Sequence, residues 1–183
     1  TLGIVPPAYR AVRVQALKAG IDFAAMLGVR DVVTHAGFLP ENMTDPEYRP
    51  VAETLRELAL YAKERGCNFL FETGQETPVT LLRFIEEVGT GNLGINLDPA
   101  NLILYGKANP VDALKVFGKY VMGVHAKDGD YPTNGRELGQ ERRLGDGMVN
   151  FPRLIAALKE VGYDGVLTIE REIEGDEQTR DIL

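Results

Sequence analysis

The sequence lacks the features of several classes of protein. It holds a single cysteine, Cys67, which excludes an internal disulfide and fits a reducing compartment. It has no run of 18 apolar residues and nothing that resembles a signal peptide, so we expect a soluble, cytoplasmic protein with no membrane partner. Lysine and arginine number 20 against 27 aspartates and glutamates, and the net charge of -7 argues against a nucleic-acid partner.

Nucleotide-binding fingerprints are also missing. No predicted strand is followed by G-x-G-x-x-G and there is no Walker loop, so a Rossmann-type site is not favoured. The chain does contain 183 residues of which 44% are hydrophobic, enough for one globular domain with a real core. Its ends, "TLGIVPP" and "DEQTRDIL", read as the tail of a strand and the first turns of a helix. We therefore expect a single domain over residues 1–183 that is truncated at both ends.

Helical and strand patterns alternate along the chain. The predicted helices combine apolar residues at helical spacing with glycine stops, and the predicted strands are short, near-continuous apolar runs. Two of the helices begin with a capping residue followed by proline, Thr77–Pro78 and Asn109–Pro110. The predicted strands lie within 29–37, 67–74, 92–101, 120–128 and 165–172, and the predicted helices within 8–28, 45–66, 77–89, 109–119 and 150–162.

This alternation predicts the α/β class, with a parallel sheet covered by helices. Such a sheet is either doubly wound or closed into a (β/α)8 TIM barrel. A complete barrel of about 250 residues would need roughly three strands more than this chain provides. We therefore expect an incomplete barrel that holds about strands 4–8 with their helices.

A chemically versatile residue stands at the end of every predicted strand. In α/β folds the ligand site lies at the carboxyl ends of the strands. Each of these residues also has an ordinary interpretation: a glutamate could form a buried ion pair, an aspartate could cap the next turn, and a histidine could be structural. The residues in question are His35, Glu72, Asp98, His125 and Glu170.

The set is more specific than its members. Three carboxylates and one imidazole around a point suit one divalent cation, such as Mn²⁺, Mg²⁺, Co²⁺ or Zn²⁺. Without a cation, three clustered carboxylates would repel one another and at least one would take up a proton. Cys67 begins its strand, at the opposite end of the predicted barrel, so a thiolate ligand is not expected.

Four segments of the sequence resemble a known family. "FETG", "NLDPANL", "GVHAKDGDYPTNGRELGQERRLGDGMVNFPRLI" and "GVLTIEREIEGDEQTRDI" are similar to the xylose isomerase-like TIM-barrel superfamily, and most of all to its sugar phosphate isomerase/epimerase proteins, which include tagatose 3-epimerase-like enzymes. The resemblance covers essentially the whole chain. Its spaced set E…D…H-x-K-D…E is fairly specific for the superfamily, but says little about the substrate.

The resemblance implies a divalent-metal-dependent isomerase or epimerase. Glu72, Asp98, His125 and Glu170 would bind one metal ion, and Glu72 and Glu170 would also exchange protons with the substrate carbon. The substrate would be a ketose, a sugar phosphate or a related polyol, converted through an enediolate that the metal stabilises as a Lewis acid.

Further residues are implied in substrate binding. His35 matches a position near the substrate in some relatives, and Lys127 and Asp128 match the H-x-K-D stretch, where they would shape the rim of the site. Asn101 and Tyr131 depart from the tagatose 3-epimerase-like pattern, which has histidine and arginine there, so the sugar specificity of those enzymes is not carried over. The long loop from Asp128 to Gly147 offers Arg142 or Arg143 for a phosphate or carboxylate.

Other functions remain open on the sequence. A dehydratase or isomerase acting on an inositol-type or keto-acid substrate would use the same residues. An endonuclease IV-like repair enzyme would need further histidines, and Asn101 stands where one of them is required. A non-catalytic fragment that binds a metal or a sugar is the third alternative. It would expose the edges of its sheet and would need missing sequence, a second copy or another chain, and a homo-oligomer is one such arrangement.

Overall fold

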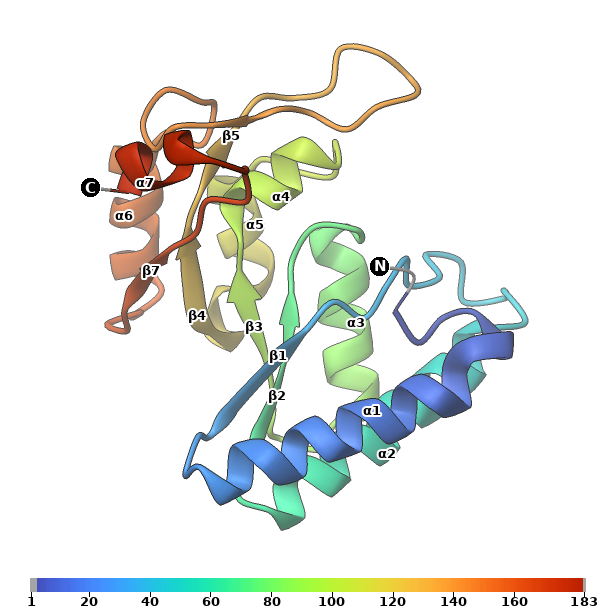
Figure 1. Cartoon of the computed structure of the whole chain (residues 1–183). Coiled ribbons are helices and arrows are strands. Elements are labelled where there is room, and N and C mark those ends of the chain that lie inside the picture. Colours follow the sequence, from blue (N-terminus) through green and yellow to red (C-terminus); the bar gives the residue numbers. More distant parts are fainter. Residues whose placement is uncertain (1–2, 183) are drawn as a thin grey trace. The chain divides into compact units, whose positions relative to one another are not determined.

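The computed structural model describes residues 3–182. The chain divides into two compact units. Unit 1 comprises the chain up to Glu72 together with Val79–Ile95, and unit 2 comprises Thr73–Pro78 together with the chain from Asn96 onward. Each unit is described by itself below, with the element labels of Figure 1.

Helices and strands alternate as the sequence predicts. Five main strands are joined by helices, and residues 176–182, in the segment expected to begin a helix, form α7. The helices are α1 (Pro7–Met26), α2 (Tyr48–Glu64), α3 (Pro78–Val88), α4 (Pro99–Leu104), α5 (Pro110–Phe117), α6 (Phe151–Glu160) and α7 (Asp176–Ile182), with a 3₁₀ turn at Gly118–Tyr120. The strands are β1 (Asp31–Thr34), β2 (Asn68–Glu72), β3 (Leu93–Leu97), β4 (Val121–Ala126) and β7 (Leu167–Ile169), with a small hairpin of β5 (Asp128–Gly129) and β6 (Glu141–Arg142).

The main sheet has the order β1-β2-β3-β4-β7. Its pairs β1–β2 and β4–β7 are parallel, with Asp31 opposite Asn68 and Val124 opposite Leu167. Parallel strands in sequential order, each followed by a helix, are the arrangement of a (β/α)8 barrel. The predicted fold class, part of such a barrel, is confirmed.

Unit 1 buries the apolar stripe predicted within residues 45–66. Val51, Leu55 and Leu58 on α2 are at most 1% exposed, as is Phe69 on β2. The centre of β2 is buried at three consecutive residues, Phe69–Phe71. A strand that is apolar on both faces is typical of a parallel sheet.

Unit 2 contains α5, whose start the sequence marks, and α6, whose cap the sequence analysis did not predict. The Asn109 side chain accepts hydrogen bonds from the backbone N–H groups of Val111 and Asp112, which caps α5 before Pro110. Asn150 caps α6 in the same way from a left-handed conformation, φ 57°, which asparagine tolerates better than most residues. The two helices contact each other, and each leads along the chain into a strand of the site, α5 into β4 and α6 into β7.

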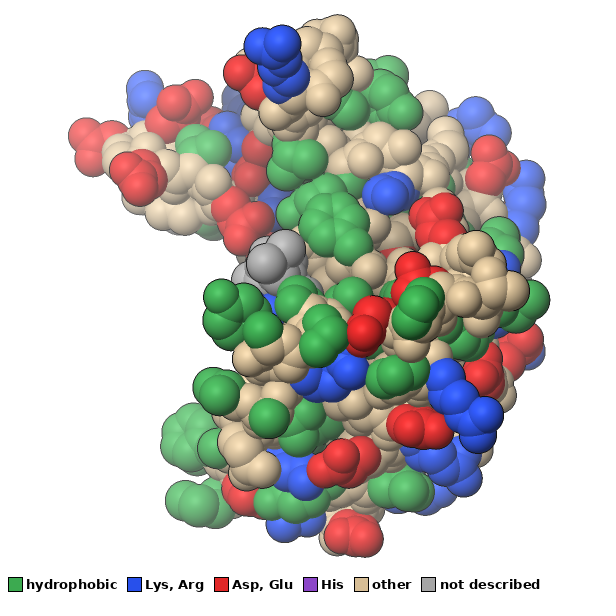
Figure 2. Space-filling view, turned by 90° about the vertical axis from the view of Figure 1, so that its right-hand side faces the viewer, with side chains coloured by type: hydrophobic (Ala, Val, Ile, Leu, Met, Phe, Trp, Pro, Cys, Tyr) green, Lys and Arg blue, Asp and Glu red, His purple; other side chains and the backbone are tan. Residues whose placement is uncertain are grey.

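The side chains at the surface are of mixed type. Figure 2 shows acidic, basic and hydrophobic side chains interspersed on the face in view. Among the helices of residues 3–182, none is both long and apolar enough to cross a membrane.

Candidate metal centre

Asp98 follows β3 and caps the helix that comes next. Its Oδ1 accepts a hydrogen bond of 2.8 Å from the backbone N–H of Asn101, and Pro99 occupies the first helical position. The capping role considered for Asp98 is thus confirmed, but it uses only one carboxylate oxygen. The side chain is 0% exposed, and its Oδ2 has no hydrogen-bond partner within the described residues. A fully buried carboxylate oxygen of this kind calls for a cation.

His125 presents one ring nitrogen to that oxygen. Its Nδ1 lies 3.7 Å from Asp98 Oδ2 and 3.3 Å from Glu170 Oε2. Its other nitrogen, Nε2, lies 3.0 Å from the side-chain amide of Asn96 on β3. A partner on the far nitrogen fixes the orientation of the ring. For Nδ1 to bind a metal ion, Nε2 must carry the ring proton, and the Asn96 amide must then face it with its oxygen as the acceptor.

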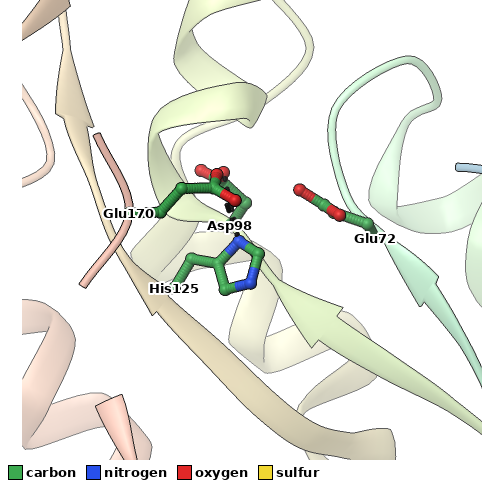
Figure 3. Close-up of side chains that lie close together, drawn as sticks. All are labelled: Glu72, Asp98, His125 and Glu170. Carbon is green, nitrogen blue, oxygen red and sulfur yellow. Dashed lines mark ion pairs between the residues drawn. The ribbon is translucent and has the colours of Figure 1, made fainter. Parts of the chain in front are cut away.

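Glu170 completes a triad within unit 2. It follows β7, and its backbone N–H donates to the Ala126 carbonyl at 3.2 Å, so the side chain starts from a fixed point beside β4. The ligand atoms of the triad Asp98, His125 and Glu170 all lie within 4.8 Å of one another. Figure 3 shows the His125 ring with its nitrogen directed toward the carboxylates of Asp98 and Glu170.

The donor set fits a divalent cation. One imidazole nitrogen and carboxylate oxygens are ligands shared by Mn²⁺, Zn²⁺ and Co²⁺, and carboxylate oxygens alone suit Mg²⁺. The Asp98 Oδ2 atom is buried and has no hydrogen bond among residues 3–182. Its ion pair with the Lys127 ammonium is long, at 3.5 Å, and this favours an ion over a purely structural cluster.

Glu72 and His35 belong to unit 1. Glu72 is the last residue of β2, and its Oε1 lies 3.6 Å from Nε2 of His35, which follows β1. The peptide bond after Glu72 leads to Thr73, whose hydroxyl donates to the Asp98 carbonyl and accepts from the Asp98 N–H, both at 2.8 Å. Glu72 therefore directly precedes Thr73, the residue whose hydroxyl is hydrogen-bonded to the backbone of Asp98. Figure 3 draws its side chain with the other three.

Replacing Thr73 with valine is expected to lower the free energy of unfolding by about 1–3 kcal/mol. Valine has the same shape but leaves the N–H and the carbonyl of Asp98 without the partner they share, in a fully buried position. Urea unfolding would measure the loss. Thr73→Ser keeps the hydroxyl and serves as the control; a loss for valine no larger than that for serine would contradict this account.

Lys127 and Asp128 do not lie at the rim. Both are 1% exposed, and Lys127 points to Glu170, with Nζ 2.9 Å from Oε2. Asp128 accepts hydrogen bonds from backbone N–H groups of the loop before α6. The expectation of rim residues, or of a surface ion pair, is wrong for both. The loop before α6 covers Asp128, and Lys127 lies among carboxylates of β6 and of the segment after β7.

The other predicted binding residues remain predictions. Asn101 lies on α4, is buried, and its backbone N–H serves the Asp98 cap. Of the two loop arginines, Arg142 donates from Nε to Asp130 at 2.6 Å. Arg143 is exposed and lines a charged hollow together with Asp146.

Sequence reasoning missed Asn96 and Thr73. Asn96 stands two residues before Asp98, and residues two apart on a strand share a face, so the period of β3 could have found it. Its room comes from Gly123, because a Cβ at that position would lie 2.4 Å from Asn96 Oδ1. Thr73 has no comparable signal, since its partner lies 25 residues away along the chain.

Comparisons with known proteins agree with the fold. A family model described as "Xylose isomerase-like TIM barrel" matches residues 1–183. The crystal structure of a xylose isomerase domain protein from Planctomyces limnophilus is 40% identical, with a TM-score of 0.91 over 100% of this chain. A D-tagatose 3-epimerase-like protein is 26% identical, with a TM-score of 0.77 over 99% of this chain and 70% of its own. An inosose dehydratase of Lacticaseibacillus casei is 27% identical over 72% of this chain.

The chain is shorter than these relatives. It spans 64% of the Planctomyces limnophilus structure and 49% of the inosose dehydratase.

Proposed function

Because this chain belongs to the xylose isomerase-like TIM-barrel family, we propose that it holds one divalent cation through Asp98, His125 and Glu170, with Glu72 as the further ligand that the family resemblance implies. We propose that it acts on a sugar as an isomerase or epimerase. The observation that carries this proposal is the triad at the strand ends, with a buried Asp98 oxygen that has no hydrogen bond within residues 3–182. The similarity to a D-tagatose 3-epimerase-like protein supports a ketose or related polyol, with or without phosphate, as the substrate.

Two carboxylates are available for proton transfer. Glu170, 28% exposed at its side chain, combines access to a substrate with a fixed position, since Lys127 holds its Oε2 at 2.9 Å. Glu72 is 15% exposed and is paired with His35. One carboxylate would remove the proton next to the substrate carbonyl and the other would return it, a form of catalysis that contributes about 10²–10⁴-fold in rate. A bound cation would supply Lewis-acid stabilisation of the charge that develops at the carbonyl oxygen.

A dehydratase is the second candidate, favoured by the similarity to inosose dehydratase. It shares the first step, removal of a proton from the carbon beside a carbonyl. It differs in the second, because a carboxylic acid then protonates a departing hydroxyl and water is lost. The same pair of carboxylates could serve either reaction, so the product decides between them.

The test is a proton-exchange assay on the metal-loaded protein. The protein would be titrated with Mn²⁺ and then incubated in D₂O with ketoses, their phosphates and an inosose. Deuterium in recovered substrate and in an epimer or aldose would support the isomerase or epimerase, and loss of water would support the dehydratase instead. A protein that binds no Mn²⁺, or that binds it without exchanging any proton, would overturn the proposal. Metal-stripped protein is the control.

A further inference from the structure

We infer that Lys127 is a built-in counter-cation of the metal centre, which lowers the affinity of the centre for a divalent ion and stabilises the centre when no ion is bound. This inference rests on the proposed function. It concerns three groups in unit 2: the ammonium of Lys127, the triad, and two further glutamates that contact the ammonium.

Lys127 and His125 face the same two oxygen atoms. The two residues are two positions apart at the end of β4, which places their side chains on one face. Lys127 Nζ lies 2.9 Å from Glu170 Oε2 and 3.5 Å from Asp98 Oδ2. These are the oxygens to which His125 Nδ1 points, at 3.3 Å and 3.7 Å. The ammonium therefore shares with the triad the carboxylate oxygens that a cation would bind.

The ammonium also has carboxylates outside the triad. It donates a hydrogen bond to Glu172 and lies 3.9 Å from Glu141 Oε2. Glu141 in turn accepts a hydrogen bond of 3.0 Å from Arg171. Glu172 is 66% exposed at its side chain, so it can be changed without opening the core. The ammonium thus contacts two of the metal ligands and also two glutamates outside the triad, of which Glu172 is exposed and Glu141 is largely buried.

Lys127 remains charged in this setting. Carboxylate oxygens of Asp98, Glu141, Glu170 and Glu172 all lie within 3.9 Å of its Nζ, and this surplus of negative charge keeps the ammonium protonated. Without a metal ion, this charge offsets the buried carboxylate of Asp98, which would otherwise be costly. In the metal-free protein the ammonium thus supplies part of the positive charge that a bound metal ion would supply.

A bound metal ion changes the role of the ammonium. Two positive groups would then share Asp98 Oδ2 and Glu170 Oε2, and like charges a few ångströms apart repel strongly in a buried site. Lys127 should therefore weaken metal binding. A lysine that merely supported the ligands would do the opposite, since its removal would disorder them and weaken binding.

The decisive experiment compares Mn²⁺ affinity in wild type and Lys127→Met. The inference predicts that the methionine variant binds Mn²⁺ about 10-fold more tightly. The metal-free variant should melt at a lower temperature than wild type, and saturating Mn²⁺ should raise its melting temperature by more. Lys115→Met is the matched control, because Lys115 pairs with Asp112 at 2.8 Å on the exposed face of α5. That variant should bind like wild type.

A second variant tests the opposite direction and does not disturb the core. Glu172→Gln removes the charge that draws the ammonium away from the metal ligands, so Mn²⁺ binding should weaken by roughly three-fold. If Lys127→Met does not fold without metal, the Glu172→Gln titration decides. Unchanged or weaker binding by Lys127→Met, or unchanged or tighter binding by Glu172→Gln, would overturn the inference while leaving the proposed function intact. A wild-type protein that binds no Mn²⁺ would instead remove the proposed function itself.

Discussion

Replacing Asp98 with asparagine is expected to lower the affinity of the protein for Mn²⁺ by at least about 100-fold, since even residues that only orient metal ligands are worth about 10–100-fold. Asparagine keeps an Oδ1 atom for the hydrogen bond from Asn101, and it is as good a helix cap as aspartate. What it loses is the anionic Oδ2, the oxygen shared by His125 and Lys127. The substitution therefore separates the cap from the metal ligand within a single side chain.

Two measurements would check this expectation. Titration with Mn²⁺ gives the affinity, and urea unfolding of the metal-free proteins shows whether the fold is retained. Asp112→Asn, on the exposed face of α5, is the control for the removal of a carboxylate as such. Affinity within a few-fold of wild type for Asp98→Asn would mean that Asp98 is a cap and nothing more.

Replacing Asp128 with alanine is expected to lower the free energy of unfolding by about 3–5 kcal/mol, because a buried donor left without an acceptor costs about 1–3 kcal/mol. Asp128 Oδ1 accepts from the N–H groups of Gly129 and Val149, and its Oδ2 accepts from those of Gly145 and Gly147. One buried carboxylate thus binds three N–H groups of the loop 145–149. Without it, these groups of the segment that leads into α6 lose their acceptor.

Asp128→Asn is the matched variant for this prediction. Its carbonyl oxygen can replace Oδ1, but its NH₂ group would face the N–H groups that Oδ2 now serves, so about half of the loss is expected. Urea unfolding gives both values. A loss below about 1 kcal/mol for Asp128→Ala would mean that water satisfies the loop as well as the carboxylate does.

The sequence predicts the parts of this centre that depend on strand period and strand ends. Asp98, His125 and Glu170 are predicted because each stands where a short apolar run stops, and parallel strands gather such ends at one edge. The cap Asn109 follows from equally local chemistry. These inferences depend only on neighbouring residues in the sequence and not on contacts between distant segments.

The burial of Lys127 and Asp128 could not be predicted in the same way. Polar residues after a strand are expected at the surface, and these two are buried by segments from elsewhere in the chain. Residues 141–149 return over Asp128, whereas Lys127 lies among the carboxylates of Asp98, Glu170 and Glu172. Lys127 pairs with carboxylates 43 and 45 residues further along the chain. Partners at that distance follow from loop closure and side-chain packing, for which a single sequence carries no periodic signal.

The fit of Asn96 against Gly123 restricts how this centre can vary in evolution or in an engineered library. A side chain at position 123 would place its Cβ 2.4 Å from Asn96 Oδ1, so it can be accepted only together with a smaller residue at position 96. Such an exchange would also remove the amide that holds Nε2 of His125. Positions 96 and 123 should therefore be varied together in a library, and a homologue that carries a larger residue at position 123 must orient its histidine by another group.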